Sequence, residues 1–562
     1  MLFSPIIIGN LTLKNRIIMP AIDLGFCPDG MVNKRMIQFY RERAQGGAGL
    51  IMVGGAAIDT SGIYGGFTAI SDDTMVEGHQ ELASAIKKAG AIPGIQLFHS
   101  GRYSFAYVNG GQVVAPSPVP SRLTGHVPRE LTINEIKDLV IAFGVAAVRA
   151  QKAGYQVIEV ISSAGYLINQ FLSPLTNRRE DEYGGSFENR MRFGLEVVRT
   201  IRSRAGSEAV LSVRLGGSDF MPGSNTWREM SVFAAELEKA SVNMLNVTGG
   251  WHEAGIPLIQ AEVPQGGYAY LAGKIKEKVS IPVAATNRIN DPRTAEKILN
   301  NGQADLISVA RGFLADEHWA VKASKRPETI RRCIGCMTCL EQILNHEMTN
   351  VSGVLCAINP RCGFETGRVI KPALESKKVL IIGAGPAGLE AARVTALQGH
   401  HVMIWEKSDR IGGQWNIAHI PPGKEEFASL TAYYKNVLPL LGVEIAFNKE
   451  ADLTAVKAEE ADHIIVASGA RPAELKLPAN EDAYVINAWD VLSEKPLIGK
   501  KIVVVGGGSV GCETAAHIAE IGTIDASTVR FMMLNQSEDP ETIRELMTRG
   551  TYNVSIIEAM PR

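Results

Sequence analysis

Short apolar runs rich in β-branched residues alternate with longer amphipathic stretches over the first 330 residues. The stretches NEIKDLVIAFGVAAVRAQKAG and RTAEKILNNG have the 3.6-residue period of helices, so strands alternate with helices. The eight predicted strands lie at residues 16–21, 50–55, 92–99, 156–162, 210–216, 244–250, 281–287 and 304–310. Eight β/α repeats over about 300 residues predict a (β/α)8 barrel, whose active site lies at the carboxyl ends of the strands.

Polar side chains follow several of these predicted strands. They are Gln96, His99, Tyr166, Arg214, His252, Arg288 and Arg311. Arg288 and Arg311 follow the last two strands, where barrels of this type often hold a phosphate. Arg214 lies on the fifth strand, where a cation can stabilise charge that develops on a bound ring. Any one arginine alone is better explained by a rim ion pair, so the prediction depends on several of them occurring at strand ends together.

The last 190 residues begin after the polar linker GFETGRVIKPALESKK and contain a dinucleotide-binding pattern. A strand leads into a GxGxxG loop, a helix follows, and the next strand ends in an acid 18 residues after the third glycine. The glycines let the backbone approach a pyrophosphate, and the acid accepts from ribose hydroxyls. The turn IGGQW at 411–415 is of the kind found near the same cofactor. The predicted cofactor-binding residues are Gly383, Gly385, Ala387, Gly388, Glu406 and Gln414.

A second copy of this pattern follows, with Gly506, Gly508 and Gly511 in its loop. Two such units, with FAD bound first and a nicotinamide nucleotide second, form a common reductase arrangement. A polar segment of about 30 residues separates the second helix from its next strand, which ends near Glu558. We therefore expect an incomplete nicotinamide module or a shortened chain, and the choice between NADH and NADPH stays open.

Composition adds one unusual feature, a cluster of cysteines. Five of the seven cysteines lie within residues 331–363, and the spacing is Cys333-x2-Cys336-x2-Cys339-x16-Cys356. Zinc and a [4Fe–4S] cluster both accept four thiolates, and three close cysteines with one distant cysteine favour iron–sulfur. Cys362 is a spare candidate for the fourth ligand. The plainer alternative is a set of reduced structural cysteines.

The charge balance excludes several classes of protein. Lys plus Arg is 57 and Asp plus Glu is 59, which gives a net charge of -2 and no sign of a nucleic-acid or polybasic membrane surface. The N-terminus does not resemble a signal peptide, and no apolar stretch approaches the roughly 18 residues of a membrane span. We expect a soluble cytoplasmic protein with no nucleic-acid or membrane partner. The expected domains are 1–330 (barrel), 331–370 (cluster segment), 371–478 (FAD module) and 479–562 (NAD(P) module).

Taken in this order, these parts resemble the Old Yellow Enzyme-like group that includes bacterial 2,4-dienoyl-CoA reductase, trimethylamine dehydrogenase and 2-naphthoyl-CoA reductase. The resemblance is carried by KNRIIMPA, IQLFHSGR, GYLINQFLSPLTNRREDEYGGSFENRMRF, NVTGGWHEAGIP, SVARGFLAD, CIGCMTC with CAINP, and GAGPAGLEAA. It implies an α/β fold with a barrel, an iron–sulfur region and Rossmann-like modules. It also implies FMN, FAD, a [4Fe–4S] cluster and NAD(P)H as cofactors.

The resemblance further implies where FMN would bind. The backbone near Ala21 and Gly55 would meet the ring, Gln96 its pyrimidine edge, and Arg214 its N1 and O2. The phosphate would lie at Arg288, Arg311 and Gly312. Asn287 stands where the family usually has glycine, which puts close backbone approach there in doubt.

On the substrate side, classical ene-reductases carry a histidine pair where this chain has Ile161 and Ala164. The stretch instead looks like the dienoyl-CoA reductases, which implies Tyr166 as proton donor with His252 beside it. The two residues before the third cysteine match trimethylamine dehydrogenase, because dienoyl-CoA reductases usually have three.

The leading hypothesis is therefore NAD(P)H-dependent reduction of a conjugated dienoyl-CoA or aryl-CoA. Electrons would pass from FAD through the cluster to FMN. One alternative is an amine dehydrogenase that donates electrons to a carrier protein. Another is an electron-transfer subunit without its own substrate. The sequence leaves an electron-carrier partner and a homo-oligomer open.

Overall fold

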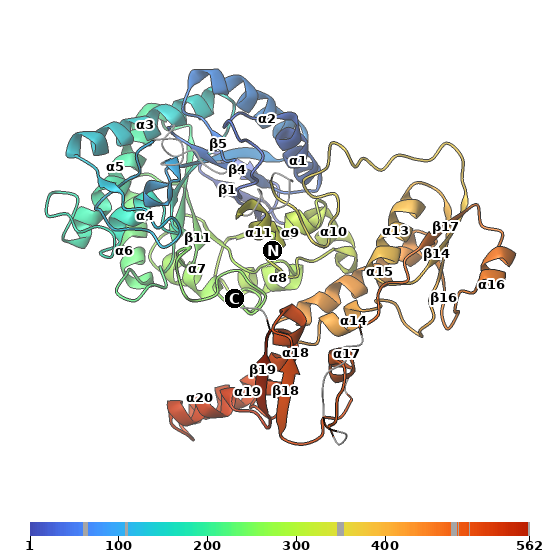
Figure 1. The fold of residues 1–562 in the computed structure, drawn as a ribbon. Helices are drawn as coiled ribbons and strands as arrows, with labels where there is room; N and C mark the ends of the chain where they lie inside the picture. The colour runs from blue at the N-terminus through green and yellow to red at the C-terminus, as the bar shows by residue number, and fades with distance from the viewer. Residues whose placement is uncertain are drawn as a thin grey trace. The chain divides into compact units, whose positions relative to one another are not determined.

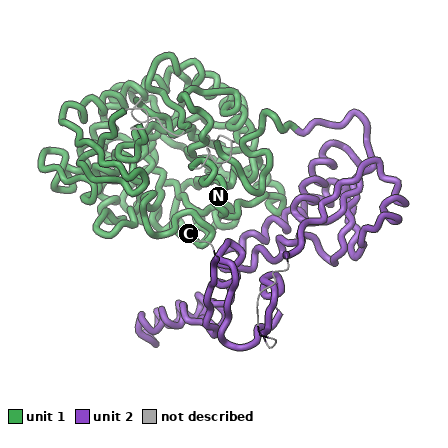
Figure 2. The backbone as a smooth tube through the Cα atoms, viewed as in Figure 1, with its two compact units in different colours: residues 1–369 green, residues 370–562 purple. Residues whose placement is uncertain are grey.

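The computed structural model describes residues 1–59, 66–106, 111–344, 353–473, 480, 483–493 and 495–559. These residues form two compact units, 1–369 and 370–562 (Figure 2). The division lies within the polar linker that precedes the first glycine-rich loop. Each unit has its own sheets, and each is described separately below.

The first unit is built on a closed parallel barrel, as the alternation of apolar runs predicts (Figure 1). Its strand order is β3-β13-β12-β11-β10-β9-β6-β4, and β4 closes the barrel by pairing with β3. These strands are β3 (Ile17–Met19), β4 (Leu50–Ala57), β6 (Ile92–Phe98), β9 (Val157–Ser162), β10 (Val210–Gly216), β11 (Met244–Thr248), β12 (Val283–Ala285) and β13 (Leu306–Ser308). The prediction of a TIM barrel is confirmed.

Helices surround the barrel because their apolar faces pack on the strands. They are α1 (Lys34–Gln45), α2 (Val76–Lys88), α3 (Ile133–Lys152), α5 (Phe187–Ala205), α6 (Trp227–Lys239), α7 (Ala269–Lys276), α8 (Pro292–Asn300) and α10 (Trp319–Lys325). Shorter helices lie on the connections: α4 (Leu167–Leu172), α9 (Arg311–Ala315) and α11 (Thr338–Leu344). Capping boxes begin two of the long helices, at Thr132 with Glu135 and at Thr226 with Glu229.

An antiparallel hairpin, β1 (Ile6–Ile8) with β2 (Leu11–Leu13), packs against the barrel. Its side chains Ile8 and Leu13 are fully buried in a cluster with Val210, Met244 and Leu306. Because these three residues lie at or near the starts of their strands, the hairpin covers the amino end of the barrel. Three further short strands are β5 (Thr68–Ala69), β7 (Val114–Ala115) and β8 (Arg129–Glu130).

The second unit begins with a four-stranded parallel sheet in the order β16-β15-β14-β17. Its elements are β14 (Lys378–Ile382), α13 (Pro386–Leu397), β15 (His401–Trp405), α14 (Trp415–Ala418), α15 (Ala428–Leu440), β16 (Glu444–Ala446), α16 (Leu453–Ala458), β17 (His463–Val466) and α17 (Ala488–Leu492). This order of strands and helices is Rossmann-like, as predicted.

A parallel pair of strands follows, β18 (Lys501–Val505) with β19 (Asn553–Ile557). Between them lie α18 (Ser509–Glu520), α19 (Ala526–Asn535) and α20 (Pro540–Thr548). The polar insertion noted in the sequence thus forms two helices, and the strands on either side of it still pair in parallel register.

A membrane-crossing helix would have to be long and apolar, and no helix among the described residues meets that condition.

Candidate active site

Tyr166 and His252 meet at the mouth of the barrel although 86 positions separate them in the chain. Ala164, after β9, forms a parallel bridge with Trp251, after β11, and His252 N donates to Ala164 O at 3.2 Å. The two rings lie 5.5 Å apart, centroid to centroid, with their planes at 88°. This contact is edge to face between rings, and it places a phenol and an imidazole together where a barrel carries its chemistry.

Two further aromatic rings complete the wall around this pair. Phe98 at the end of β6 lies edge to face with Tyr166, at 5.6 Å. Tyr103 lies 6.0 Å from Tyr166 and 5.9 Å from His252. Tyr103 was not predicted from the sequence, although it lies four residues beyond the end of the predicted third strand. Its phenol oxygen is buried and makes no hydrogen bond with any residue that the structure describes.

The protonation states of the pair differ. Burial raises the pKa of the Tyr166 phenol, and Asp23 raises it further, against the opposing effect of Arg214. Burial and the charge of Arg214 lower the pKa of His252 to about 4. His252 is exposed to solvent, which weakens the effect of burial, but Arg214 acts in the same direction. At neutral pH Tyr166 is therefore protonated and His252 is neutral.

A buried ion pair supports this wall from behind. Arg102 precedes Tyr103, Glu253 follows His252, and their side chains pair with only 5% and 2% exposure. Glu253 also accepts from Ser121 Oγ at 2.8 Å. Because a buried pair of this kind is costly to break, the ion pair fixes the two ring-bearing segments against each other.

Arg214 on β10 lies at the centre of the mouth. Its Nη1 donates to Ala21 O at 2.8 Å, which joins two of the predicted flavin contacts. Its Nε is buried and makes no hydrogen bond with any described residue. A buried, unpaired guanidinium donor is costly, so this position suits an acceptor atom of a bound ring.

Gln96, the third predicted ring contact, is held from below by a buried carboxylate. Gln96 Nε2 donates to Glu159 Oε1 at 2.7 Å. Glu159 lies on β9 and was not singled out from the sequence. The signal was present, since an acid inside the apolar run QVIEVIS is unusual in a strand buried on both faces.

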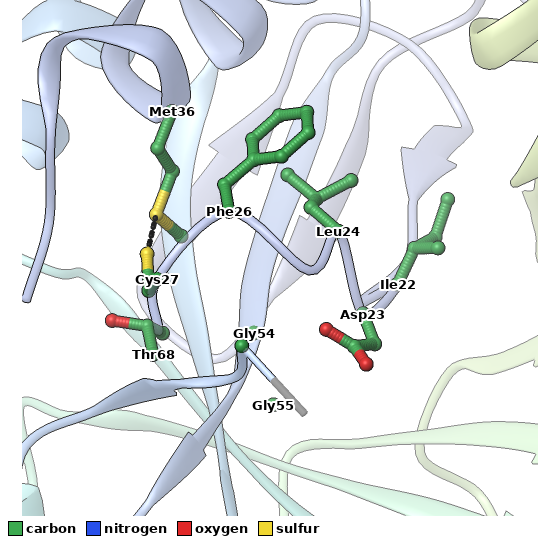
Figure 3. A pocket seen from close by; sticks show the side chains of 10 residues that line it. Ile22, Asp23, Leu24, Phe26, Cys27, Met36, Gly54, Gly55 and Thr68 are labelled. Carbon is green, nitrogen blue, oxygen red and sulfur yellow. Dashed lines mark hydrogen bonds between the residues drawn. The ribbon is translucent and has the colours of Figure 1, made fainter. Parts of the chain in front are cut away.

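The backbone around the mouth allows close approach by a flat ligand. A Cβ on Gly55 would lie 2.6 Å from the Phe98 ring, so the position accepts no side chain. Gly54 and Gly55 line a small pocket with Asp23, which follows Ala21 (Figure 3). Burial raises the pKa of Asp23 to about 7, against hydrogen bonds from the backbone of Gly25 and Leu24. These residues and the unpaired Nε of Arg214 fit a flavin ring.

Arg288 and Arg311 converge on one loop, as their places after the last two strands suggest. Arg288 Nε donates to Val263 O at 2.9 Å, and Arg311 donates to Ile259 O. Asn287 adopts the left-handed conformation, with φ at 67°, so asparagine meets the backbone demand that the family's usual glycine would meet. A Cβ on Gly312 would lie 2.5 Å from Val309 Cγ1, so that turn also requires glycine.

The four predicted cysteine ligands come from two separate segments, and Cys333 and Cys336 of the first segment influence the pKa of Cys356 in the second. Burial raises the pKa of Cys339 to about 11 and that of Cys356 to about 12, and both values are raised further by Cys333 and Cys336. Within the described ranges, no three His, Cys, Asp or Glu side chains are close enough to hold one metal ion. Four thiolates can bind either zinc or a [4Fe–4S] cluster, so the preference for iron–sulfur rests on the spacing of the cysteines in the sequence.

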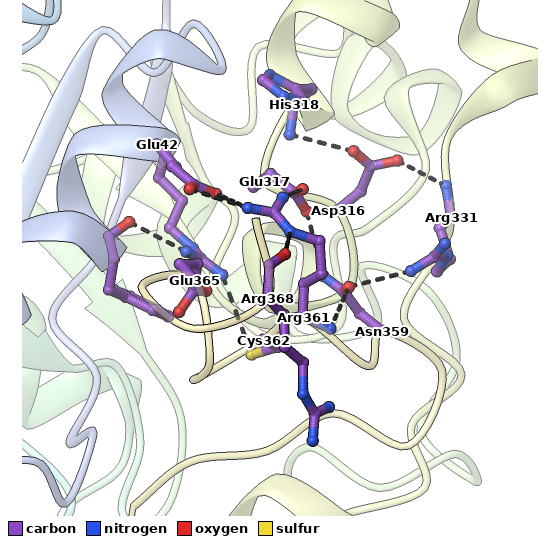
Figure 4. Close-up of polar contacts among 12 residues, drawn as sticks. Glu42, Asp316, Glu317, His318, Arg331, Asn359, Arg361, Cys362, Glu365 and Arg368 are labelled. Carbon is purple, nitrogen blue, oxygen red and sulfur yellow. Dashed lines mark hydrogen bonds and ion pairs between the residues drawn. The ribbon is translucent and has the colours of Figure 1, made fainter. Parts of the chain in front are cut away.

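Cys362, the spare candidate, belongs to a different environment (Figure 4). Its Sγ accepts from Arg43 Nη2 at 3.9 Å, and Arg43 pairs with Glu365 at 2.7 Å with exposures of 0% and 2%. Burial raises the pKa of the Cys362 thiol well above its usual range. The contact of Cys362 with the buried ion pair of Arg43 and Glu365 favours a structural role over ligation.

The first glycine-rich loop has the geometry that the dinucleotide pattern predicts. Gly383 has φ at 105°, and a Cβ on Gly388 would lie 2.0 Å from Gly383 O. A Cβ on Gly385, before Ala387 in α13, would meet open space, which leaves room for a pyrophosphate. Glu406 Oε2 accepts from Ala384 N at 2.7 Å, so the acid lies beside the loop.

The turn IGGQW packs on this first loop. The second glycine-rich loop has the same geometry as the first. Gly412 N donates to Ala384 O at 2.8 Å, and Gln414 Nε2 donates to Ala470 O at 2.9 Å. In the second loop Gly506 has φ at 104°, Gly508 is the N-cap of α18, and a Cβ on Gly511 would lie 1.8 Å from Gly506 O. Glu558 Oε2 accepts from Gly507 N at 2.6 Å, as Glu406 does from Ala384. The inserted helices therefore do not remove the acid from its place.

Two family models match the chain. Residues 1–329 match the NADH:flavin oxidoreductase / NADH oxidase family, and residues 377–562 match the pyridine nucleotide-disulphide oxidoreductase family. The two matches cover the barrel and the Rossmann-like unit.

Known proteins resemble the chain over nearly its whole length. A metal reductase of Desulforamulus reducens is 48% identical over 99% of this chain and 84% of its own length. A cinnamate reductase of Clostridium sporogenes is 34% identical over 93% of this chain and 81% of its own. The solved complex of 2-naphthoyl-CoA reductase with 2-naphthoyl-CoA superposes with a TM-score of 0.89, at 33% identity, over 100% of this chain and 88% of that one.

Proposed function

The chain belongs to the NADH:flavin oxidoreductase / NADH oxidase family, and on this basis we propose that it reduces a conjugated C=C bond in an acyl-CoA thioester with electrons from a nicotinamide nucleotide. The substrate would be a 2,4-dienoyl-CoA or an aromatic acyl-CoA. The likeness to 2-naphthoyl-CoA reductase supports the thioester, and the likeness to a cinnamate reductase supports reduction of a conjugated double bond.

The observation that carries this proposal is the contact between Tyr166 and His252 at the barrel mouth. Addition of hydrogen across a conjugated bond needs a hydride on one carbon and a proton on the other. A flavin held in the mouth by Gln96 and Arg214 would supply the hydride. Tyr166, whose raised pKa keeps its phenol protonated, supplies the proton. His252 is neutral at pH 7, so it assists as a hydrogen-bonding partner for the phenol oxygen rather than as a charged acid.

The residues at positions 161 and 164, where classical ene-reductases carry a histidine pair, support the same proposed function. Ile161 is buried and packs with Ala57, Ala69 and Phe98 in an apolar cluster. A carbonyl-gripping pair is therefore absent from positions 161 and 164, and a small enone has no imidazole donor there. A larger acyl-CoA can draw binding energy from parts of the molecule remote from the reacting bond.

The flavin-binding roles follow from the site. Ala21, Gly55, Gln96 and Arg214 would hold the ring of FMN, with Arg214 Nε as the donor to its acceptor edge. Arg288, Arg311 and the turn at Gly312 would hold the phosphate. The guanidinium of Arg214 would attract negative charge on the reduced ring, because a buried cation close to the ring is only weakly screened, and it shares its own charge with Glu159.

The remaining cofactors would bring electrons to the barrel. Cys333, Cys336, Cys339 and Cys356 would hold a [4Fe–4S] cluster, which accepts and gives single electrons. The first glycine-rich loop, with Glu406, would hold FAD. The second loop would hold the nicotinamide nucleotide.

The position of Glu558 favours NADH over NADPH. Its carboxylate lies against the second loop, where an acid accepts from the ribose 2′-hydroxyl of NADH. A 2′-phosphate at the same place would face a like charge and lose affinity. We therefore assign NADH as the preferred donor.

The test is an anaerobic reduction and reoxidation experiment on the cofactor-loaded protein. NADH should bleach the flavin absorbance, and a dienoyl-CoA or aryl-CoA should restore it in stoichiometric amount. Cinnamate as the free acid serves as a matched probe, because it carries the conjugated bond without the CoA group. Restoration by no unsaturated acyl compound would contradict the proposal, and bleaching by a tertiary amine would point to an amine dehydrogenase.

A second candidate is supported by the relative with 48% identity, a metal reductase. In this case electrons would leave to a soluble metal complex instead of a C=C bond. The same bleached protein separates the two functions, since a metal complex would restore the absorbance equally well in a Tyr166→Phe variant, which keeps its cofactors.

A further inference from the structure

A single carboxylate lies at the centre of the polar network beneath the proposed ring site. Glu159 on β9 is 0% exposed. Its Oε1 accepts from Gln96 Nε2 at 2.7 Å, and its Oε2 accepts from Ser212 Oγ at 2.9 Å and from Asn246 Nδ2 at 3.2 Å. Asn246 is held in turn by Ser308 Oγ at 3.0 Å. Glu159 is thus built into the barrel by partners from neighbouring strands.

Arg214 is the charged group that faces this carboxylate. The strand β6 presents Gln96, β10 presents Ser212 and Arg214, and β11 presents Asn246, so the other partners are neutral. The carboxylate and the guanidinium together carry no net charge. Burial raises the pKa of Glu159, against the opposing effects of Arg214 and of the three hydrogen-bond donors.

Electron uptake by the ring would disturb this balance. An oxidised flavin is neutral, so the site with Glu159 and Arg214 has a net charge of zero. A flavin that has gained two electrons and one proton is an anion, and the site then carries one uncompensated negative charge. A buried uncompensated charge is costly, and such sites respond by changing protonation.

We infer that Glu159 binds a proton when the ring above Gln96 and Arg214 is reduced, and that it releases this proton on reoxidation. The inference rests on the proposed binding of FMN in the barrel. In balanced form, two electrons from NADH and one proton enter the ring, and a second proton passes from solvent to the carboxylate of Glu159. On reoxidation the two electrons and the ring's proton would pass to the substrate as a hydride, and Glu159 would release its proton to solvent.

The hydrogen-bond partners can hold Glu159 in either state. The amide groups of Gln96 and Asn246 only donate through the nitrogens that face the carboxylate. Ser212 differs from them because its hydroxyl rotates, donating to a carboxylate and accepting from a carboxylic acid. The protonated acid therefore has an acceptor for its new hydrogen at Oε2, and Ser212 is the residue that makes the change possible.

The test is a reduced-minus-oxidised infrared difference spectrum of the cofactor-loaded protein in H₂O and in D₂O. We expect a carboxylic-acid C=O band to appear on reduction, to shift in D₂O, and to vanish in Glu159→Gln. A wild-type spectrum without such a band would overturn the inference, and so would a band that persists in Glu159→Gln.

The variant Ser212→Ala provides a second test of the inference in case Glu159→Gln fails to fold. Without the hydroxyl, the acid loses its acceptor, so its C=O band should weaken or move toward the frequency of a free acid. An unchanged band in Ser212→Ala would count against the inference.

The inference and the proposed function can fail separately. Chemical reduction with dithionite bleaches bound flavin whether or not any acyl-CoA restores it, so the infrared measurement does not depend on the substrate. A protein that turns over acyl-CoA without the Glu159 band refutes the inference alone. The band without turnover of any unsaturated compound refutes the proposed function alone.

Discussion

Tyr166→Phe is the most direct test of the proposed proton transfer, because it removes one oxygen atom and keeps the ring. The ring centroids of Phe98, Tyr103 and His252 lie 5.6, 6.0 and 5.5 Å from that of Tyr166, and phenylalanine keeps the ring that makes these contacts. The variant should therefore fold and bind its cofactors as the wild type does. Any change in rate can then be attributed to the lost proton donor.

The size of the effect follows from the role. A positioned general acid contributes about 10²–10⁴-fold, which corresponds to roughly 3–5 kcal/mol of activation free energy. A structural phenol with no part in the reaction would change the rate much less. Flavin reduction by NADH does not use this proton, so that half-reaction should keep its wild-type rate.

The assay is anaerobic stopped-flow absorbance, with reduction by NADH and reoxidation by acyl-CoA followed separately. Tyr183→Phe is the matched control, since Tyr183 is also a buried tyrosine and its hydroxyl donates to Glu196 at 2.9 Å in another part of the barrel unit. Slowing of both half-reactions alike in Tyr166→Phe would refute the reasoning and make Tyr166 a structural residue.

The reoxidation rate should be flat between about pH 8 and pH 10, because Asp23, with a pKa of about 7, is ionised there, Tyr166 has a raised pKa, and His252 has a pKa of about 4; a bell-shaped profile within that range would contradict the assignment. Cys356→Ser should lose cluster iron while Cys362→Ser keeps it, as measured by iron analysis under anaerobic conditions, and equal iron in both would exclude the proposed ligand. Glu558→Ala should lower kcat/KM for NADH by about 10–150-fold, from the loss of a charged hydrogen bond of about 1.5–3 kcal/mol, and an unchanged NADH to NADPH ratio would argue against its role. Glu365→Ala should lower the free energy of unfolding by about 3–5 kcal/mol, because it leaves a buried guanidinium unpaired; denaturant titration measures this, and a wild-type midpoint would refute it.

The barrel could be predicted from the sequence because its strands are buried on both faces. Runs such as LIMVGG and VLSVRLG are apolar at every inward and outward position but one or two, and this is the pattern of a parallel strand covered by helices. The GxGxxG loops could be predicted equally well, because the first and third glycines meet a backbone or steric demand and the second leaves room for a pyrophosphate. In both cases the signal lies within a short stretch of the chain.

The composition of the site was harder to predict. Tyr166 meets His252 only because a backbone bridge joins the segments after β9 and β11, and no local pattern specifies that bridge. Tyr103 lies beyond a strand end in the segment HSGRYS, where a polar residue does not stand out. Glu159 could have been found, because an acid in the middle of a buried strand requires partners that the sequence alone does not name.

The bridge between Ala164 and Trp251 spans the end of β10, which lies between β9 and β11 in the barrel. The loop that carries Tyr166 and the loop that carries His252 are therefore joined by this bridge across the end of β10. Neither loop can drift, lengthen or be exchanged on its own without disturbing the other. Attempts to redirect this scaffold toward new substrates by grafting loops should transplant both as one piece.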